Sequence, residues 1–96
     1  MVSLSGIRRH REEILRIVAR HRARNPRLFG SVLRGTLTPG SDVDILVKLD
    51  DDSSLIDQIA LMRELEQLLA CPVDVVSEDA LPDAIRGRVL AEGTPL

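Results

Sequence analysis

The stretch LFGSVLRG at residues 28–35, followed by SDVDILV at residues 41–47, decides the fold of this 96-residue chain. Residues 43–49 alternate and are rich in branched side chains, which predicts a strand with Asp42 at its mouth. Ahead of it, a short strand over 27–29 runs into Gly30-Ser31 and a brief helix. Pro39-Gly40 suits a type II turn, because glycine tolerates the positive φ that such a turn requires.

The rest of the chain alternates in the same way. Apolar residues at helical spacing predict helices over 5–22 and 54–70, the first ended by Asn25-Pro26 and the second by Cys71-Pro72. The further elements are a strand over 73–76, a new cap at 77–79, and a final helix marked by Leu81, Ile85, Val89 and Leu90.

This order predicts an α/β (α+β) domain in which helices pack on a small mixed sheet. We expect a single domain, with an N-terminal helix in residues 1–26 and a catalytic core in residues 27–96. The length allows one modest hydrophobic core. No apolar run approaches the roughly 20 residues that span a bilayer, so we expect no membrane contact and a cytoplasmic protein.

The net charge of −2 conceals an asymmetry between the two parts of the chain. Residues 1–34 hold nine arginines against two acids, and residues 35–96 hold thirteen acids against four basic residues. A basic stretch can bind phosphates or nucleic acid, although a solvated helix face is the commoner case. Phe29 is the only aromatic residue and is expected in the core, so direct nucleic-acid binding by base stacking is disfavoured.

Two carboxylates stand two residues apart on the predicted strand 43–49. Asp42 and Asp44 would point to one face, while Val43 and Ile45 point to the other. Paired hard oxygen ligands suit Mg²⁺, which takes one or two carboxylates together with substrate phosphates. A solvated pair at a strand edge is the alternative, and it is the better reading of the pair in isolation.

Gly30 and Ser31 favour the metal-binding interpretation of Asp42 and Asp44. A glycine at a strand-to-helix step lets backbone amides approach a phosphate, and the helix N-terminus adds positive potential. Ser31 can donate its hydroxyl, or it can be an ordinary helix cap. Arg34, one turn later, can brace a phosphate oxygen or be solvated.

Asp74 is the third candidate carboxylate. It stands in the apolar run Pro72-Val73-Asp74-Val75-Val76, where a charge is costly without a metal or a partner. If the strand 73–76 lies beside the strand 43–49, three carboxylates converge. The alternative is a side chain that points outward to solvent.

These two segments, with ten residues between Ser31 and Asp42, resemble the signature of the polymerase-β-like nucleotidyltransferase superfamily. The chain is most similar to its minimal, MntA-like branch, and residues 73–81 resemble the segment that carries the third acid of that branch. The resemblance implies that Asp42, Asp44 and Asp74 are catalytic and hold two Mg²⁺ ions. It also implies that Gly30 and Ser31, with Arg34, bind the triphosphate of ATP.

The resemblance further implies an acceptor. Proteins of the MntA-like branch act as antitoxins that transfer AMP to a tyrosine of a cognate HEPN-type RNase toxin, which is the partner we expect. A binding module that neutralises its partner by covering it is the alternative, and transfer to a small molecule of the aminoglycoside type is a third. The oligomeric state stays open and includes a homo-oligomer. An exposed apolar face on the first or last helix would indicate assembly with the partner.

Overall fold

The computed structural model describes residues 4–29 and 43–96. Their elements, in chain order, are α1 (Leu4–Arg9), α2 (Arg11–Arg20), β1 (Ala23–Phe29), β2 (Val43–Leu49), α4 (Leu55–Leu69), β3 (Val73–Ser77), the 3-10 helix η1 (Glu78–Ala80), α5 (Asp83–Glu92) and β4 (Thr94–Pro95). The four strands form one sheet in the order β3-β2-β1-β4. Strands β2 and β3 run parallel, and the other two pairs are antiparallel. The predicted mixed sheet packed by helices is therefore confirmed.

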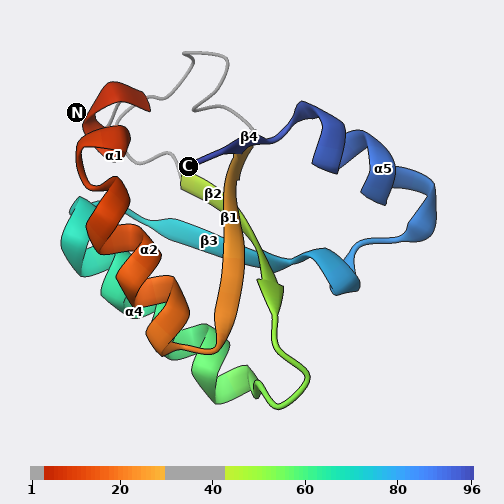
Figure 1. The fold of residues 1–96 in the computed structure, drawn as a ribbon, viewed down its shortest axis with the longest axis horizontal. Coiled ribbons are helices and arrows are strands. Elements are labelled where there is room, and N and C mark those ends of the chain that lie inside the picture. Colours follow the sequence, from red (N-terminus) through yellow and green to blue (C-terminus); the bar gives the residue numbers. More distant parts are fainter. Residues whose placement is uncertain (1–3, 30–42) are drawn as a thin grey trace.

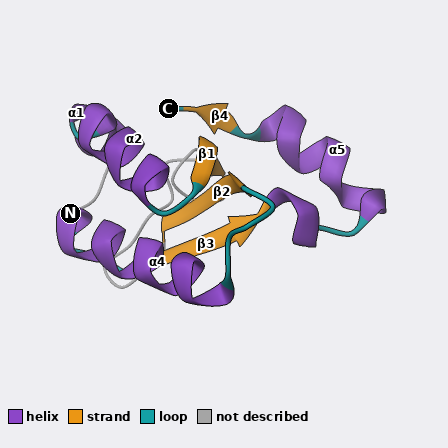
Figure 2. Cartoon of the chain, turned by 60° about the horizontal axis from the view of Figure 1, so that its bottom comes forward, coloured by secondary structure: helices purple, strands orange, loops and turns teal. Residues whose placement is uncertain are grey.

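The hydrophobic core lies between one face of the sheet and the helices α1, α2 and α4 (Figures 1 and 2). Helix α5 lies on the other side of the sheet. Alternation along β2 sends its odd-numbered residues into the core, where Val43, Ile45 and Val47 are fully buried. Leu61 and Leu65 of α4 pack in the same cluster. Because the odd positions of β2 are buried on the helix side, its even positions belong to the opposite face.

Helix α4 begins at a pair of reciprocal hydrogen bonds between Ser54 and Asp57. The Ser54 hydroxyl accepts a hydrogen bond from the backbone N–H of Asp57, and the Asp57 carboxylate accepts one from the backbone N–H of Ser54. This reciprocal pair is a capping box. The backbone hydrogen bond from Ser54 lowers the pKa of Asp57, because it stabilises the ionised carboxylate.

The N-terminal helix differs from the prediction. It is broken at His10 into α1 and α2, and it ends at Arg20 rather than at residue 22. Arg22 adopts a left-handed φ of 61°, which turns the chain directly into β1. Asn25-Pro26 was expected to end the helix but lies inside β1, where one extra residue opposes β2 and Asn25 has a φ of 54°. A bulge of this kind accepts proline, because the extra residue makes no ladder hydrogen bond.

The C-terminal part also departs from the prediction. Strand β4 was not anticipated, and it pairs with β1 through Leu28 opposite Thr94 and Arg27 opposite Pro95. Helix α5 forms where expected, but none of its side chains is buried. No helix in the described residues is long and apolar enough to span a bilayer.

Candidate active site

Asp44 and Asp74 face each other across the parallel pair of strands β2 and β3. Their Cα positions are direct register partners, between the pairs Val43 with Val73 and Ile45 with Val75. Since those flanking residues are buried in the core, alternation places both carboxylates on the opposite face of the sheet. Asp44 is half-buried and Asp74 is exposed. The condition that the strand of Asp74 lies beside the strand of Asp44 is therefore met.

The other predicted site residues, Asp42, Gly30, Ser31 and Arg34, lie outside the described residues. The residues that flank this segment in the chain are Phe29 at the end of β1 and Val43 at the start of β2. Phe29 pairs with Asp44, and Val43 pairs with Val73. Both flanking residues thus lie at the same end of the sheet as the two carboxylates.

Phe29 does not belong to the core, which corrects the expectation from the sequence. It is half-buried and is the register partner of Asp44 on β1, so it stands on the carboxylate face. The next position on that face pairs Arg27 of β1 with Leu46 of β2. Leu46 is fully buried yet lies outside the core cluster, so the middle of the carboxylate face is covered. The bulge in β1 hid this arrangement, because it reverses which residues of 23–29 face the helices.

Comparison with known proteins identifies the family of the chain. Residues 7–95 match the family model described as the nucleotidyltransferase domain. The chain belongs to this nucleotidyltransferase family.

Two sequence relatives of this nucleotidyltransferase come from archaea. A protein of Methanocaldococcus jannaschii, provisionally named a protein adenylyltransferase, is 33% identical over 85% of this chain and 88% of its own. The protein adenylyltransferase MntA of Thermococcus cleftensis is 43% identical over 68% of this chain and 66% of its own.

Two solved structures extend the likeness to the whole fold. One, of a protein provisionally identified as a minimal nucleotidyltransferase, superposes with a TM-score of 0.89 at 42% identity and covers 99% of this chain and 97% of that chain. The other is a crystal structure of a toxin-antitoxin with AMP-PNP, with a TM-score of 0.73 at 25% identity, covering 88% of this chain and 70% of that chain.

The donor set of the nucleotidyltransferase site fits a divalent cation. Neighbouring strands lie about 4.8 Å apart. The carboxylate oxygens that Asp44 and Asp74 carry on two such strands are hard ligands of the kind that Mg²⁺ prefers. Within residues 4–29 and 43–96, no three His, Cys, Asp or Glu side chains gather as a metal site. Asp44 and Asp74 are the two predicted carboxylates within the described residues, and the third, Asp42, lies outside them.

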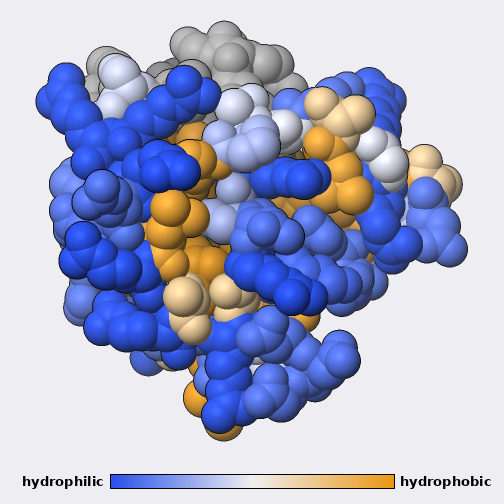
Figure 3. Space-filling model, in the orientation of Figure 1, coloured by the Kyte–Doolittle hydropathy of each residue, from blue (hydrophilic) through white to orange (hydrophobic). Residues whose placement is uncertain are grey.

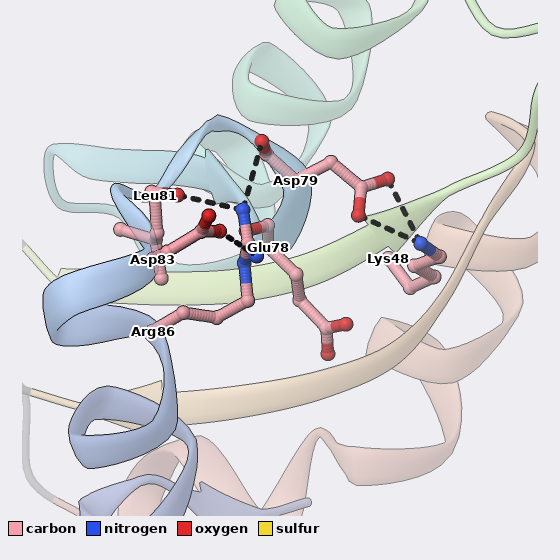
Figure 4. Close-up of polar contacts among 6 residues, drawn as sticks. All are labelled: Lys48, Glu78, Asp79, Leu81, Asp83 and Arg86. Atoms are coloured by element: carbon pink, nitrogen blue, oxygen red, sulfur yellow. Dashed lines mark hydrogen bonds and ion pairs between the residues drawn. The ribbon is translucent and has the colours of Figure 1, made fainter.

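An ion pair ties the far end of the carboxylate face to the turn that follows β3. The Lys48 ammonium donates to both carboxylate oxygens of Asp79 at 2.8 Å (Figure 4). The hydrogen bond from Lys48 lowers the pKa of Asp79, because it stabilises the charged form. Lys48 stands four residues after Asp44 on the same strand, so the pair joins η1 to the strand that carries the site.

Arg86 fixes the connection between η1 and α5. Its guanidinium donates to the carbonyl oxygens of Glu78 and Leu81 at 3.1 and 2.7 Å, and to the Asp83 carboxylate at 2.6 Å (Figure 4). The planar fork of arginine carries five N–H donors and can satisfy acceptors on several residues at once. Helix α5 buries no side chain fully, and the Arg86 bonds and β4 attach its two ends to the rest of the domain.

Proposed function

We propose that this nucleotidyltransferase transfers AMP from ATP to a hydroxyl of a partner protein, a tyrosine of a HEPN-type RNase toxin, and thereby acts as its antitoxin. The observation that carries the proposal is the register pairing of Asp44 with Asp74 on the same face of the sheet. The relatives add support, since one is named a protein adenylyltransferase and another structure is that of a toxin-antitoxin with AMP-PNP.

In the proposed reaction, the acceptor hydroxyl oxygen attacks the α-phosphorus of ATP. The bond from that phosphorus to the oxygen shared with the β-phosphate breaks, and pyrophosphate leaves. Mg²⁺, when held by these carboxylates, supplies charge stabilisation for the attacking and leaving oxygens. Asp74 is exposed and so can be reached by a protein acceptor. We assign it the acceptor side, where its carboxylate completes the metal site or takes the hydroxyl proton.

The remaining roles rest on the sequence motif. Gly30 and Ser31 would bind the triphosphate through backbone amides and the serine hydroxyl, and Arg34 would brace a phosphate oxygen. Asp42 would join Asp44 as a metal ligand. Phe29, as the register partner of Asp44, is a candidate for contact with the nucleotide.

The test is to incubate the protein with labelled ATP, Mg²⁺ and the HEPN-type protein encoded beside it. We expect a mass increase of one or more AMP groups on that protein and loss of its RNase activity. Asp44→Asn, Asp74→Asn and the pair Asp42→Ala with Asp44→Ala should each abolish the label. Asp79→Asn is the matched control, because its carboxylate pairs with Lys48 at the other end of the sheet.

Label that survives the substitutions at Asp42 and Asp44 would contradict the metal site. Neutralisation that needs no ATP and leaves the toxin mass unchanged would instead support a binding module. Transfer to an aminoglycoside but not to the protein would support a small-molecule enzyme. Each of the three hypotheses therefore predicts a different outcome of this experiment.

A further inference from the structure

The outward surface at the start of α4 is apolar. The side chains of Leu55 and Ile56 are 70% and 78% exposed, and Ile59 is 39% exposed. Figure 3 shows hydrophobic surface at its lower edge, in the region where α4 begins in Figure 1. Single exposed apolar residues are ordinary, but three that adjoin on one helix mark a contact surface.

Charges of opposite sign flank this apolar surface along the helix. Asp51 and Asp52, both exposed, precede the first turn of α4. Arg63, also exposed, follows Ile56 by seven residues and therefore lies on the same side of the helix. The Asp52 carboxylate already forms an ion pair with Arg22 at 2.6 Å, so we expect Asp51 to be the acid that contacts a partner. Glu66, seven residues after Ile59, is half-buried and accepts a hydrogen bond from the backbone N–H of Val73 at 3.1 Å, so Arg63 is the charge that this end exposes. The surface thus exposes an acid at one end, apolar side chains in the middle and an arginine at the other end.

A surface with this order of charges is complementary to a second copy of itself turned by 180°. In that arrangement Arg63 of one copy meets the acidic segment of the other, and the apolar residues meet in the middle. A parallel arrangement would place like charges together. Two-fold pairing of one patch with itself is the usual geometry of homodimers.

We propose that α4 forms a homodimer interface, with two copies antiparallel about an axis that passes between Ile56 and Ile59. The proposal does not depend on the proposed function. Helix α4 begins after the C-terminal end of β2, whereas Asp44 lies at the N-terminal end of that strand and on the opposite face of the sheet. The dimer would therefore not cover Asp44 and Asp74 in either copy.

Sedimentation velocity of the full chain over a range of concentrations tests the interface. We expect a reversible monomer–dimer equilibrium whose dissociation constant rises at least about tenfold in Ile56→Glu and in Ile59→Glu, since each places a charge among apolar side chains. Ile85→Glu is the matched control, because Ile85 is a 44% exposed isoleucine on α5. It should leave the equilibrium unchanged.

Charge exchange tests the antiparallel direction. Arg63→Glu and Asp51→Arg should each weaken the dimer, and the two together should restore it. When mixed under oxidation in a Cys71→Ser background, Ile56→Cys and Ile59→Cys chains should form a disulfide with one another, whereas Ile59→Cys and Ile85→Cys chains should not. Circular dichroism establishes that each variant is folded.

A wild-type chain that stays monomeric at every concentration would overturn the proposal. So would a dimer that persists at unchanged affinity in Ile56→Glu and Ile59→Glu. If the surface binds only a different protein, the chain alone stays monomeric, and the proposal fails in the same way.

Discussion

Replacing Asp74 with asparagine should stabilise the metal-free protein while it inactivates the enzyme. Asp74 and Asp44 are register partners on parallel strands, so their Cα atoms are about 4.8 Å apart. Like charges placed opposite each other in a sheet are destabilising. Asparagine keeps the size of the side chain and removes one of the two charges.

The size of the effect follows from the distance and the exposure. Two unit charges about 5 Å apart repel by about 0.8 kcal/mol in water and by about 3 kcal/mol at an effective dielectric constant of about 20. Because Asp74 is exposed, solvent screens the pair and the lower figure applies. We therefore expect Asp74→Asn to raise the free energy of unfolding by about 0.5–1 kcal/mol at low salt, with a smaller gain at high salt.

Urea unfolding at neutral pH with a chelator measures this change, and the double variant with Asp44→Asn closes a thermodynamic cycle. The second substitution should add little once the first charge is gone. Mg²⁺ should then raise the midpoint of thermal unfolding of the wild type, and less so that of Asp74→Asn, because a ligand stabilises the state that binds it. A stability that falls in Asp74→Asn, or a cycle without coupling, would refute the repulsion between these two carboxylates.

Three further substitutions test how the fold holds the site. Leu61→Ala should lower the free energy of unfolding by about 2–5 kcal/mol, because Leu61 is fully buried. Leu55→Ala, on the exposed side of the same helix, should lower it far less in the monomer. Urea unfolding at low protein concentration compares the two variants. Gly87→Ala should stabilise the protein by up to about 1 kcal/mol in the same assay, since a Cβ at this helical position meets nothing within 4 Å. The pKa of Asp79 is lowered by its hydrogen bond from Lys48, so this carboxylate stabilises the fold above about pH 4 and the contribution is lost as the pH falls further. Asp79→Asn should therefore be less stable than the wild type at neutral pH, with a difference that shrinks in acid; a difference that is constant with pH would contradict the ion pair.

The strand that carries the site could be predicted because its signal is local. Alternation over 43–49 predicts β2 with the bounds that the structure shows, and apolar residues at helical spacing over 54–70 predict α4. The pairing of Asp44 with Asp74 could be stated only as a condition. It joins residues thirty positions apart, and nothing in either strand alone specifies a parallel neighbour or a register.

The errors share a physical cause. Arg22 adopts a positive φ although arginine rarely does, so residue type gives little warning of the turn into β1. Asparagine tolerates a positive φ, but Asn25-Pro26 was expected to end a helix and not to form a bulge. The two residues of β4 pair with β1 through a tertiary contact and have no periodicity of their own. Phe29 was assigned to the core because it is aromatic, but the bulge turns it to the carboxylate face.

Alternation also explains how a sheet can hold two like charges in place. Asp44 stands between Val43 and Ile45, and Asp74 stands between Val73 and Val75, all four of which are buried in the core. A slip of one residue in either strand would bring a carboxylate into the core and expose two branched side chains to water. The free energy that fixes the register therefore comes from the helix side of the sheet, while the repulsion it must overcome lies on the other side. For this reason we expect core substitutions such as Leu61→Ala to lower activity only as far as they unfold the protein, whereas Asp74→Asn separates stability from activity.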